Sequence, residues 1–299
     1  MDKWISVSNN EPLAKRIEYI SIADLIRPID QVDLVFVQQS TQVNFDFKNV
    51  YIPCCFYYTE PIPMFPINTN SAVKYFFYAY PTCVDFLDHY FGPELNRMYK
   101  KWIPWAVNPN VYTQGSAKRT IDLGFKGSMK MIPQAKIDPA LNDFYLKRTI
   151  MLDCLKEWKE NPITITLEER TDLKELIQFM QKVNIGINIT SWELTNERQF
   201  FTLACGCVLL QYAYPQLLDL GFGDKYNCLT FGSFEELKDK IQWAKTHPKE
   251  LEQIRQHGLK TIQQHTWDCR ARQILTEILP TLKSEQARLK LVAKWHQAK

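Results

Sequence analysis

Strands and helices alternate regularly over the second half of this 299-residue chain. From Thr120 onward, short runs of β-branched residues, such as residues 121–125 and 185–189, are separated by segments with apolar residues at helical spacing, such as residues 171–182. A strand that is followed by a helix and then by another strand is typical of a parallel sheet. The sequence therefore predicts an α/β domain with helices on both faces of its sheet.

A looser form of the same pattern occupies the first half of the chain. Apolar runs at residues 33–38, 50–58 and 73–80 lie between connections rich in proline and asparagine. This is typical of short buried strands that are bounded by turns. Residues 103–107 are predicted to form a last strand before a turn. The first half is therefore expected to form a second, smaller α/β domain.

A stretch of small polar residues at 113–119 predicts the linker between the two domains. The expected organisation is a first domain over residues 1–115 and a second domain over residues 116–282. Residues 283–299 have the spacing of a basic amphipathic helix. Their polar face is mixed, which favours a packed helix over a membrane-surface helix.

Composition and charge exclude several classes of protein. The chain is 45% hydrophobic and 23% charged, which is ordinary for a folded globular protein. A net charge of +3 is too small for a protein that coats nucleic acid. No apolar run approaches the roughly 18–20 residues needed to span a bilayer, and no leader is visible at the N-terminus. A cytoplasmic protein is expected.

The eight cysteines are expected to be free, buried thiols. Cys54 and Cys55 are adjacent, and Cys205 and Cys207 flank a glycine inside an apolar segment. A zinc site would need paired C-x-x-C units or nearby histidines, and the sequence contains neither. Buried thiols in a reducing compartment fit this pattern better than disulfide bonds do.

Two segments of the second domain carry residues suited to bind an anion. A strand that ends in the turn Gly127-Ser128 lets backbone N–H groups approach a ligand, although an ordinary turn has the same residues. Glu193 precedes the helix predicted over residues 196–204, and Arg198 lies in its first turn, where a phosphate is favoured. The alternative is that Glu193 and Glu197 complement the helix dipole and Arg198 is solvated.

Five short motifs occur in the order found in group-1 glycosyltransferases, and they resemble the CgeB-like branch of that family most. The resemblance covers roughly residues 30–280. The motifs are Ile103-Pro-Trp-Ala-Val-Asn-Pro, the strand and turn ending at Gly127-Ser128 with Arg148 downstream, Arg198-x-Phe-x-x-x-Ala204-Cys205-Gly206, Phe231-x-Ser-Phe-Glu235-Glu236-Leu237 with His247-Pro248, and His265-Thr266-x-x-x-Arg270.

The resemblance implies a GT-B fold, in which two Rossmann-like domains face a central cleft. The first domain would bind the acceptor, the second would bind a nucleotide diphosphate sugar such as a UDP-sugar, and the last helix would cross back to the first domain. A hexosyltransferase-like enzyme without a cofactor is implied. No Asp-x-Asp motif is present, so a metal-independent reaction is expected. The donor-binding residues implied are Gly127, Ser128, Arg148, Glu193 and Arg198.

One position departs from the family pattern. In the family, two glutamates eight residues apart bracket the helix that follows Glu193. The first corresponds to Glu193, but the second, which grips the ribose hydroxyls, is replaced by Phe201. Phenylalanine cannot accept a hydrogen bond from a hydroxyl. A catalytically degenerate GT-B protein that binds a ligand without turnover is therefore the alternative.

Acceptor-side residues are predicted at the end of the strand at 50–58. Glu60 follows this strand directly and resembles the catalytic acid of phage DNA β-glucosyltransferases, so it is the candidate general base. The alternative is a surface carboxylate that caps a turn. Tyr58 and His89 are further acceptor-side candidates. A glycan acceptor is favoured, and a modified DNA base is the weaker alternative.

Overall fold

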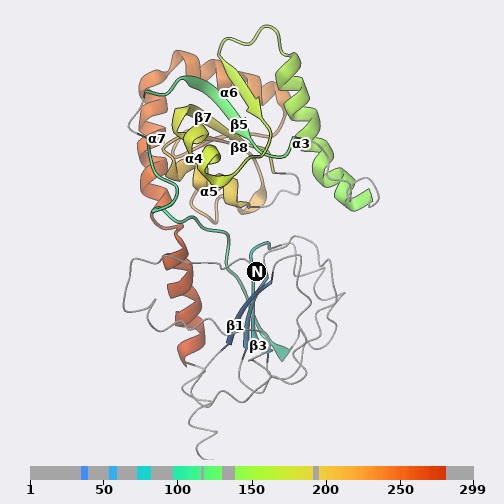
Figure 1. Ribbon diagram of the computed structural model, residues 1–299, viewed down its shortest axis with the longest axis vertical. Coiled ribbons are helices and arrows are strands. Elements are labelled where there is room, and N and C mark those ends of the chain that lie inside the picture. Colours follow the sequence, from blue (N-terminus) through green and yellow to red (C-terminus); the bar gives the residue numbers. More distant parts are fainter. Residues whose placement is uncertain are drawn as a thin grey trace, which may run out of the picture. The chain divides into compact units, whose positions relative to one another are not determined.

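The computed structural model divides the chain into two compact units (Figure 1). The first unit is Met1–Pro104 with Arg270–Lys299, and the second is Trp105–Cys269. The predicted domain boundaries, after residues 115 and 282, stay predictions. The residues that the structure describes are 35–39, 54–58, 73–81, 97–115, 118–129, 139–190 and 195–280.

The first unit contains a four-stranded parallel sheet in the order β1-β2-β3-β4. Its strands are β1 (Val35–Gln39), β2 (Cys54–Tyr58), β3 (Val73–Tyr78) and β4 (Tyr99–Trp102). Aromatic residues fill β3, where Tyr75, Phe76 and Phe77 are all buried. The first three strands confirm the predicted apolar runs. The predicted strand at 103–107 is wrong, because the last strand ends at Trp102.

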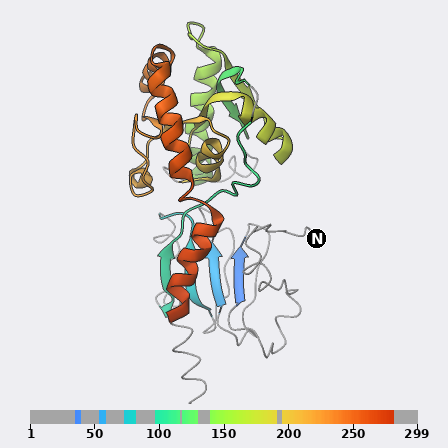
Figure 2. The same ribbon diagram turned by 90° about the vertical axis from the view of Figure 1, so that its left-hand side faces the viewer.

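The chain returns to the first unit at Arg270, within a helix that spans residues 267–280 (Figure 2). This helix bonds to the edge strand β4, because Glu277 accepts hydrogen bonds from Tyr99 and Lys101. The buried side chain of Arg270 donates from Nε to the carbonyl of Pro104 at 3.0 Å. Residues 281–299, which contain the predicted C-terminal helix, lie outside the described residues.

The second unit contains a five-stranded parallel sheet in the order β6-β5-β7-β8-β9. The first strand, β5, lies inside the sheet, with the second on one side of it and the third on the other. The strands are β5 (Ile121–Lys126), β6 (Ile165–Glu168), β7 (Val183–Asn188), β8 (Val208–Tyr212) and β9 (Leu229–Phe231).

Helices alternate with these strands, as the sequence pattern predicts. They are α3 (Pro139–Glu157), α4 (Leu173–Lys182), α5 (Glu197–Ala204), α6 (Phe234–Thr246) and α7 (Pro248–Ile262), and a short 3-10 helix, η4 (Pro215–Leu217), follows β8. Among the described residues, no helix is long and apolar enough to cross a membrane.

Alternate residues of the second sheet pack on opposite faces, as the two-residue period of a strand requires. Leu123 and Phe125 of β5 belong to one apolar cluster with Leu152 of α3 and Leu237 of α6. On the other face, the intervening Gly124 faces Phe179 of α4. The central strands of the sheet are therefore covered on both faces, whereas the outer strand β6 is partly exposed.

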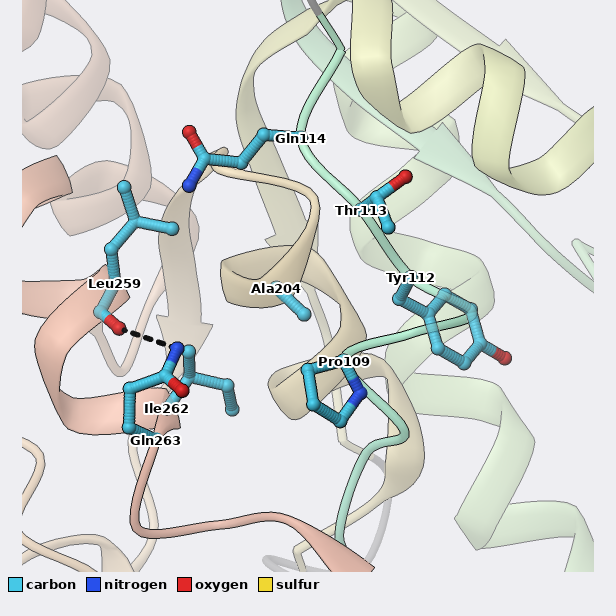
Figure 3. Close-up of a pocket in the computed structure, with 8 residues that line it drawn as sticks. All are labelled: Pro109, Tyr112, Thr113, Gln114, Ala204, Leu259, Ile262 and Gln263. Atoms are coloured by element: carbon cyan, nitrogen blue, oxygen red, sulfur yellow. Dashed lines mark hydrogen bonds between the residues drawn. The ribbon is translucent and has the colours of Figure 1, made fainter. Parts of the chain in front are cut away.

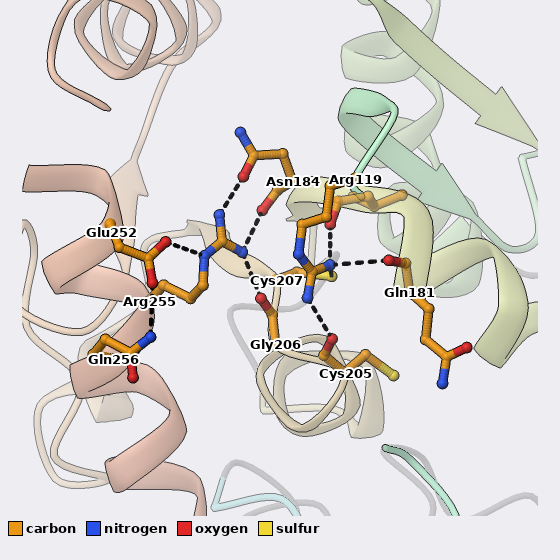
Figure 4. Close-up of polar contacts among 10 residues, drawn as sticks. Arg119, Gln181, Asn184, Cys205, Gly206, Cys207, Glu252, Arg255 and Gln256 are labelled. Carbon is orange, nitrogen blue, oxygen red and sulfur yellow. Dashed lines mark hydrogen bonds and ion pairs between the residues drawn. The ribbon is translucent and has the colours of Figure 1, made fainter. Parts of the chain in front are cut away.

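Two arginines close the edge where the strands of the second sheet begin, here called the amino edge (Figure 4). Arg119 donates to the carbonyls of Met180 at 3.3 Å and Cys205 at 2.8 Å, at the C-terminal ends of α4 and α5. Arg255 of α7 donates to the carbonyls of Asn184 at 3.3 Å and of Gly206. These arginines, here called the amino-edge pair, satisfy carbonyls that helix ends leave without partners.

The described cysteines are free thiols, as predicted. Cys55, Cys205, Cys207 and Cys228 are buried. Burial raises the pKa of the Cys207 thiol to about 11, so this thiol stays protonated at neutral pH.

Candidate functional site

The edge where the strands of the second sheet end, here called the carboxyl edge, contains a topological switch point. The chain leaves β5 towards β6 on one side, and later continues from β7 to β8 on the other side. In open parallel sheets, ligands bind beyond the carboxyl ends of the strands at such a point. The residues that follow β5 and β7 are therefore the first candidates for a binding site.

Arg198 of α5 is fixed beside the end of β5. Its Nη1 donates to the carbonyl of Lys126 at 2.6 Å, and its guanidinium carbon lies 4.3 Å from the centroid of the Phe125 ring. It also lies 5.5 Å from the Phe201 ring. The side chain is half-buried, so one part of the guanidinium is held by the protein and the rest is accessible.

Gly127 provides the space that the Arg198 guanidinium occupies. A Cβ atom at this position would overlap Nη2 of Arg198. The backbone N–H of Gly127 donates to the carbonyl of Glu168 at 3.0 Å, which extends the pairing of β5 with β6 by one residue. The turn after β5 and the first turn of α5 are thus joined through one glycine and one arginine.

Two further arginines approach Arg198. Burial is the main cause that lowers the pKa of Arg198, to about 9, and the positive charges of Arg148 and Arg170 lower it further. Arg198 is still charged at neutral pH. Arg148 lies on α3, and Arg170 follows β6 by two residues. These three guanidinium groups, here called the arginine cluster, come from three different elements.

Glu197 is the acidic neighbour of the arginine cluster. It is exposed in the first turn of α5, and its Oε1 accepts a hydrogen bond from the Tyr112 hydroxyl at 3.2 Å. Desolvation by the surrounding protein raises the pKa of Glu197. The hydrogen bond from Tyr112 and the positive charges of Arg198 and Arg170 lower it in part. Glu197 therefore balances part of the positive charge.

Phe201 does not reach a ligand-accessible position. Its side chain is 5% exposed and stacks on Tyr112, with ring centroids 5.3 Å apart. The aromatic pair packs one helical turn beyond Glu197, on the same side of α5. The position at which the family has a ribose-binding glutamate is therefore part of the apolar packing in this chain.

Lys126 belongs to a separate ion pair, although it precedes Gly127. Its Nζ lies 2.6 Å from Oε2 of Glu168, and 5.4 Å from the Phe179 ring. The Lys126 side chain is 8% exposed. Because its charge is matched by a carboxylate on the neighbouring strand, it is not available to a ligand in the way that Arg198 is.

A buried amide network supports the N-terminus of α5. Asn196 is the N-cap, and its Oδ1 accepts from the Gln199 N–H at 3.3 Å and from Asn188 Nδ2 at 3.0 Å. Asn188 in turn donates to Oε1 of Gln211 at 2.8 Å. Asn188 and Gln211 are fully buried at the ends of β7 and β8. The network fixes the first turn of α5, and with it Glu197 and Arg198, relative to the sheet.

The structure brings together three of the predicted donor-binding residues, namely Gly127, Arg148 and Arg198, with Ser128 next in the chain. Glu193 lies outside the described residues. Their roles stay predictions. Of the acceptor-side candidates, Glu60 and His89 also lie outside the described residues, and Tyr58 is the last residue of β2.

The sequence prediction missed Tyr112 and Arg170, and it considered Glu197 only as a complement to the helix dipole. Arg170 stands in the run Glu168-Glu169-Arg170, which has the pattern of a solvated loop. The placement of Arg170 immediately after a strand is the signal that points to the carboxyl edge.

His265 and Arg270, from the last motif of the family resemblance, have packing contacts. His265 is 6% exposed, and its Nε2 lies 2.9 Å from the carbonyl of Leu220. Its ring packs against Phe200 and Phe222, with centroids 5.3 and 5.4 Å away. These contacts give His265 a structural role in the packing of the second unit.

A pocket of the second unit is lined by none of the three arginines of the cluster (Figure 3). It is lined by Pro109, Tyr112, Thr113, Gln114, Ala204, Leu259, Ile262 and Gln263. Ala204 is the last residue of α5, whereas Arg198 lies in its first turn. The pocket therefore runs beside α5, from Tyr112, which bonds to Glu197 in the first turn, to Ala204 at the end of the helix.

Comparisons with known proteins agree with the two-unit α/β architecture. Residues 135–276, a little under half of the chain, match a family described as glycosyl transferase-like. No curated protein matches the sequence.

Solved structures of glycosyltransferases share the fold at low sequence identity. HepE from Anabaena in complex with UDP is 13% identical, with a TM-score of 0.54, over 87% of this chain and 82% of that one. HepE in complex with UDP-glucose also gives 0.54, at 12% identity, over 87% and 82% of the two chains. Sucrose-phosphate synthase from Thermosynechococcus elongatus is 12% identical, with a TM-score of 0.53, over 85% and 74%. The chain therefore has the GT-B fold, with a glycosyl transferase-like domain over residues 135–276.

Proposed function

We propose that this protein transfers a sugar from a nucleotide diphosphate sugar to an acceptor hydroxyl. The observation that carries the proposal is the position of Arg198, held beside Gly127 at the switch point of a GT-B fold. A guanidinium with accessible N–H groups at a helix N-terminus suits a diphosphate. HepE, which has the same fold, was solved with UDP and with UDP-glucose.

In the proposed reaction, the bond between the anomeric carbon and the diphosphate oxygen breaks, and its electron pair leaves with the diphosphate. A new bond forms between the anomeric carbon and the acceptor oxygen, whose proton passes to a base. Glu60 is our candidate for this base, and inversion at the anomeric carbon follows if it acts so. Fixed cations at the leaving group lower the barrier, because negative charge develops there in the transition state. We propose a glycan acceptor and a metal-independent reaction.

A second candidate function is ligand binding without turnover. The buried, stacked side chain of Phe201 favours it, because this side chain provides no acceptor for the ribose hydroxyls. A protein of this kind would still bind the diphosphate through the arginines.

Isothermal titration with UDP, ADP and GDP, combined with an assay for hydrolysis of labelled nucleotide sugars, tests both functions. We expect UDP or another nucleoside diphosphate to bind, and the corresponding sugar to be released to water or to an acceptor. Arg198→Ala is expected to weaken binding by about tenfold or more, because a charge-assisted hydrogen bond contributes about 1.5–3 kcal/mol.

Lys159→Ala is a matched control, since it removes one exposed positive charge at the opposite end of β6. It should leave affinity unchanged. Binding without hydrolysis or transfer, across a panel of sugars and acceptors, would favour the second function. If no nucleoside diphosphate binds to the wild-type protein, both candidate functions are wrong.

A further inference from the structure

Arg170 lies next to the turn that follows β5. Residues 168–170 run beside this turn, because Glu168 pairs with Lys126 in the sheet and accepts the hydrogen bond of the Gly127 N–H at 3.0 Å. On the other side of the turn, the N–H of Met129 donates to Oε2 of Glu169 at 3.3 Å. These contacts place the segment after β6 beside the turn at Gly127, which Arg198 also contacts.

The charge of Arg170 acts on both charged residues at the start of α5. It lowers the pKa of Glu197 and also lowers the pKa of Arg198. Within the described residues, no carboxylate forms an ion pair with Arg170 or Arg198. The nearest acidic partner on β6, Glu168, is already taken up by Lys126 at 2.6 Å. Two like charges thus approach each other, and the carboxylate of Glu197, on which both act, balances only part of their charge.

We propose that Arg170 binds the diphosphate of the nucleotide sugar, together with Arg198, across the turn at Gly127. This inference rests on the proposed function and adds a residue of the edge strand β6 to the donor site. An anion between the two guanidinium groups would remove their repulsion and receive charge-assisted hydrogen bonds from both. Arg170 is exposed, so its side chain is able to move onto the ligand after the nucleotide has entered.

The proposal predicts that diphosphates and monophosphates differ in how strongly their binding depends on Arg170. Arg198 sits at the N-terminus of α5, whereas Arg170 follows β6, so a ligand needs to reach across the turn to engage both. A diphosphate is long enough to accept hydrogen bonds at two separate phosphoryl groups. A monophosphate has a single group, so its binding should depend less on Arg170.

The test is isothermal titration of UDP and of UMP with the wild-type full-length protein and with Arg170→Ala, Arg170→Lys and the control Lys159→Ala. We expect Arg170→Ala to weaken UDP binding by about tenfold, in line with the loss of a charge-assisted contact. UMP binding should change by less than that. Arg170→Lys keeps the positive charge but loses the bidentate hydrogen bonding of a guanidinium, so it should give an intermediate affinity for UDP.

The outcomes separate this inference from the function on which it rests. If Arg170→Ala binds UDP within twofold of wild type while Arg198→Ala does not, Arg170 is not a diphosphate ligand and the proposed function stands. If UDP and UMP lose affinity equally, the two-phosphoryl arrangement is wrong. If the wild-type protein binds none of UDP, ADP and GDP, the proposed function fails as well. Because Arg170 is exposed, its substitutions should leave the fold intact, which circular dichroism checks.

Discussion

Arginines lie at both edges of the second sheet, but one group lies at the C-terminal ends of helices and the other at a helix N-terminus. The amino-edge pair, Arg119 and Arg255, donates to carbonyls at the C-terminal ends of α4 and α5 and near the start of β7. Arg198 stands instead in the first turn of α5. A helix macrodipole is negative at its C-terminus and positive at its N-terminus, so it favours a cation only at the first of these places.

This difference separates an arginine that stabilises the fold from one that is available to bind a ligand. At the amino edge, Arg119 and Arg255 each donate to several acceptors of the protein itself (Figure 4). At the carboxyl edge, Arg198 has one protein carbonyl and two like-charged neighbours. A residue kept where the helix dipole opposes it suggests a function other than stability.

The largest expected effect is on stability, from Arg119→Met. This change removes the Arg119 donors to the carbonyls of Met180, Gln181, Val183 and Cys205, and so weakens the pairing of carbonyls that are largely buried. We expect the free energy of unfolding to fall by about 2–4 kcal/mol. Urea denaturation followed by circular dichroism measures this change, and UDP affinity at low urea should stay at the wild-type value. An unchanged urea midpoint would contradict the structural role that we assign to Arg119 at the amino edge.

A smaller effect is expected from Gly127→Ala, and it should appear in binding. The new Cβ atom would overlap Nη2 of Arg198, which is the mobile end of a long side chain, so the guanidinium can swing away at little cost to the fold. We expect UDP affinity to fall by about tenfold, equivalent to about 1.4 kcal/mol. The unfolding midpoint should move far less than in Arg119→Met. If instead stability falls and affinity does not, the carboxyl edge behaves like the amino edge and the comparison fails.

The smallest effect is expected from Ser233→Ala. Ser233 also lies at the carboxyl edge, after β9, where its Oγ caps α6 by accepting from the Glu236 N–H at 3.2 Å. Glu236 in turn accepts from the Gly232 N–H at 2.6 Å, so this helix start is satisfied by the chain. We expect a loss of about 1 kcal/mol in stability and no change in UDP affinity. A change in affinity would mean that the donor site extends further along the edge than the arginine cluster does.

The sequence predicted the second unit better than the first, for a physical reason. Its strands are buried on both faces, so they read as continuous apolar runs, as in Ile185–Ile187 of β7. The edge strand β4 carries Lys100 and Lys101, a composition that edge strands use and that resembles a loop. Pro104 lacks an N–H, so the ladder stops just after Ile103 donates to Tyr78 at 2.9 Å.

Individual site residues could be predicted, but their contacts could not. The turn at Gly127 and the helix start at Arg198 are local patterns, and each was identified. Their contact depends on the order of strands in the sheet, because it joins segments about 70 residues apart in the chain. Arg170 joins them only through the pairing of β5 with β6. The local sequence around Arg170, an exposed arginine after two glutamates, gives no signal that it belongs to a binding site.

The return of the chain to the first unit has a consequence for biosynthesis. Residues 105–269 form a complete unit, whereas the first unit needs residues from both ends of the chain. During synthesis from the N-terminus, the second unit can therefore fold while the first still lacks the helix that brings Glu277 to Tyr99 and Lys101. The strands made earliest would be completed last, and the aromatic first sheet would be the part most in need of chaperones on the ribosome.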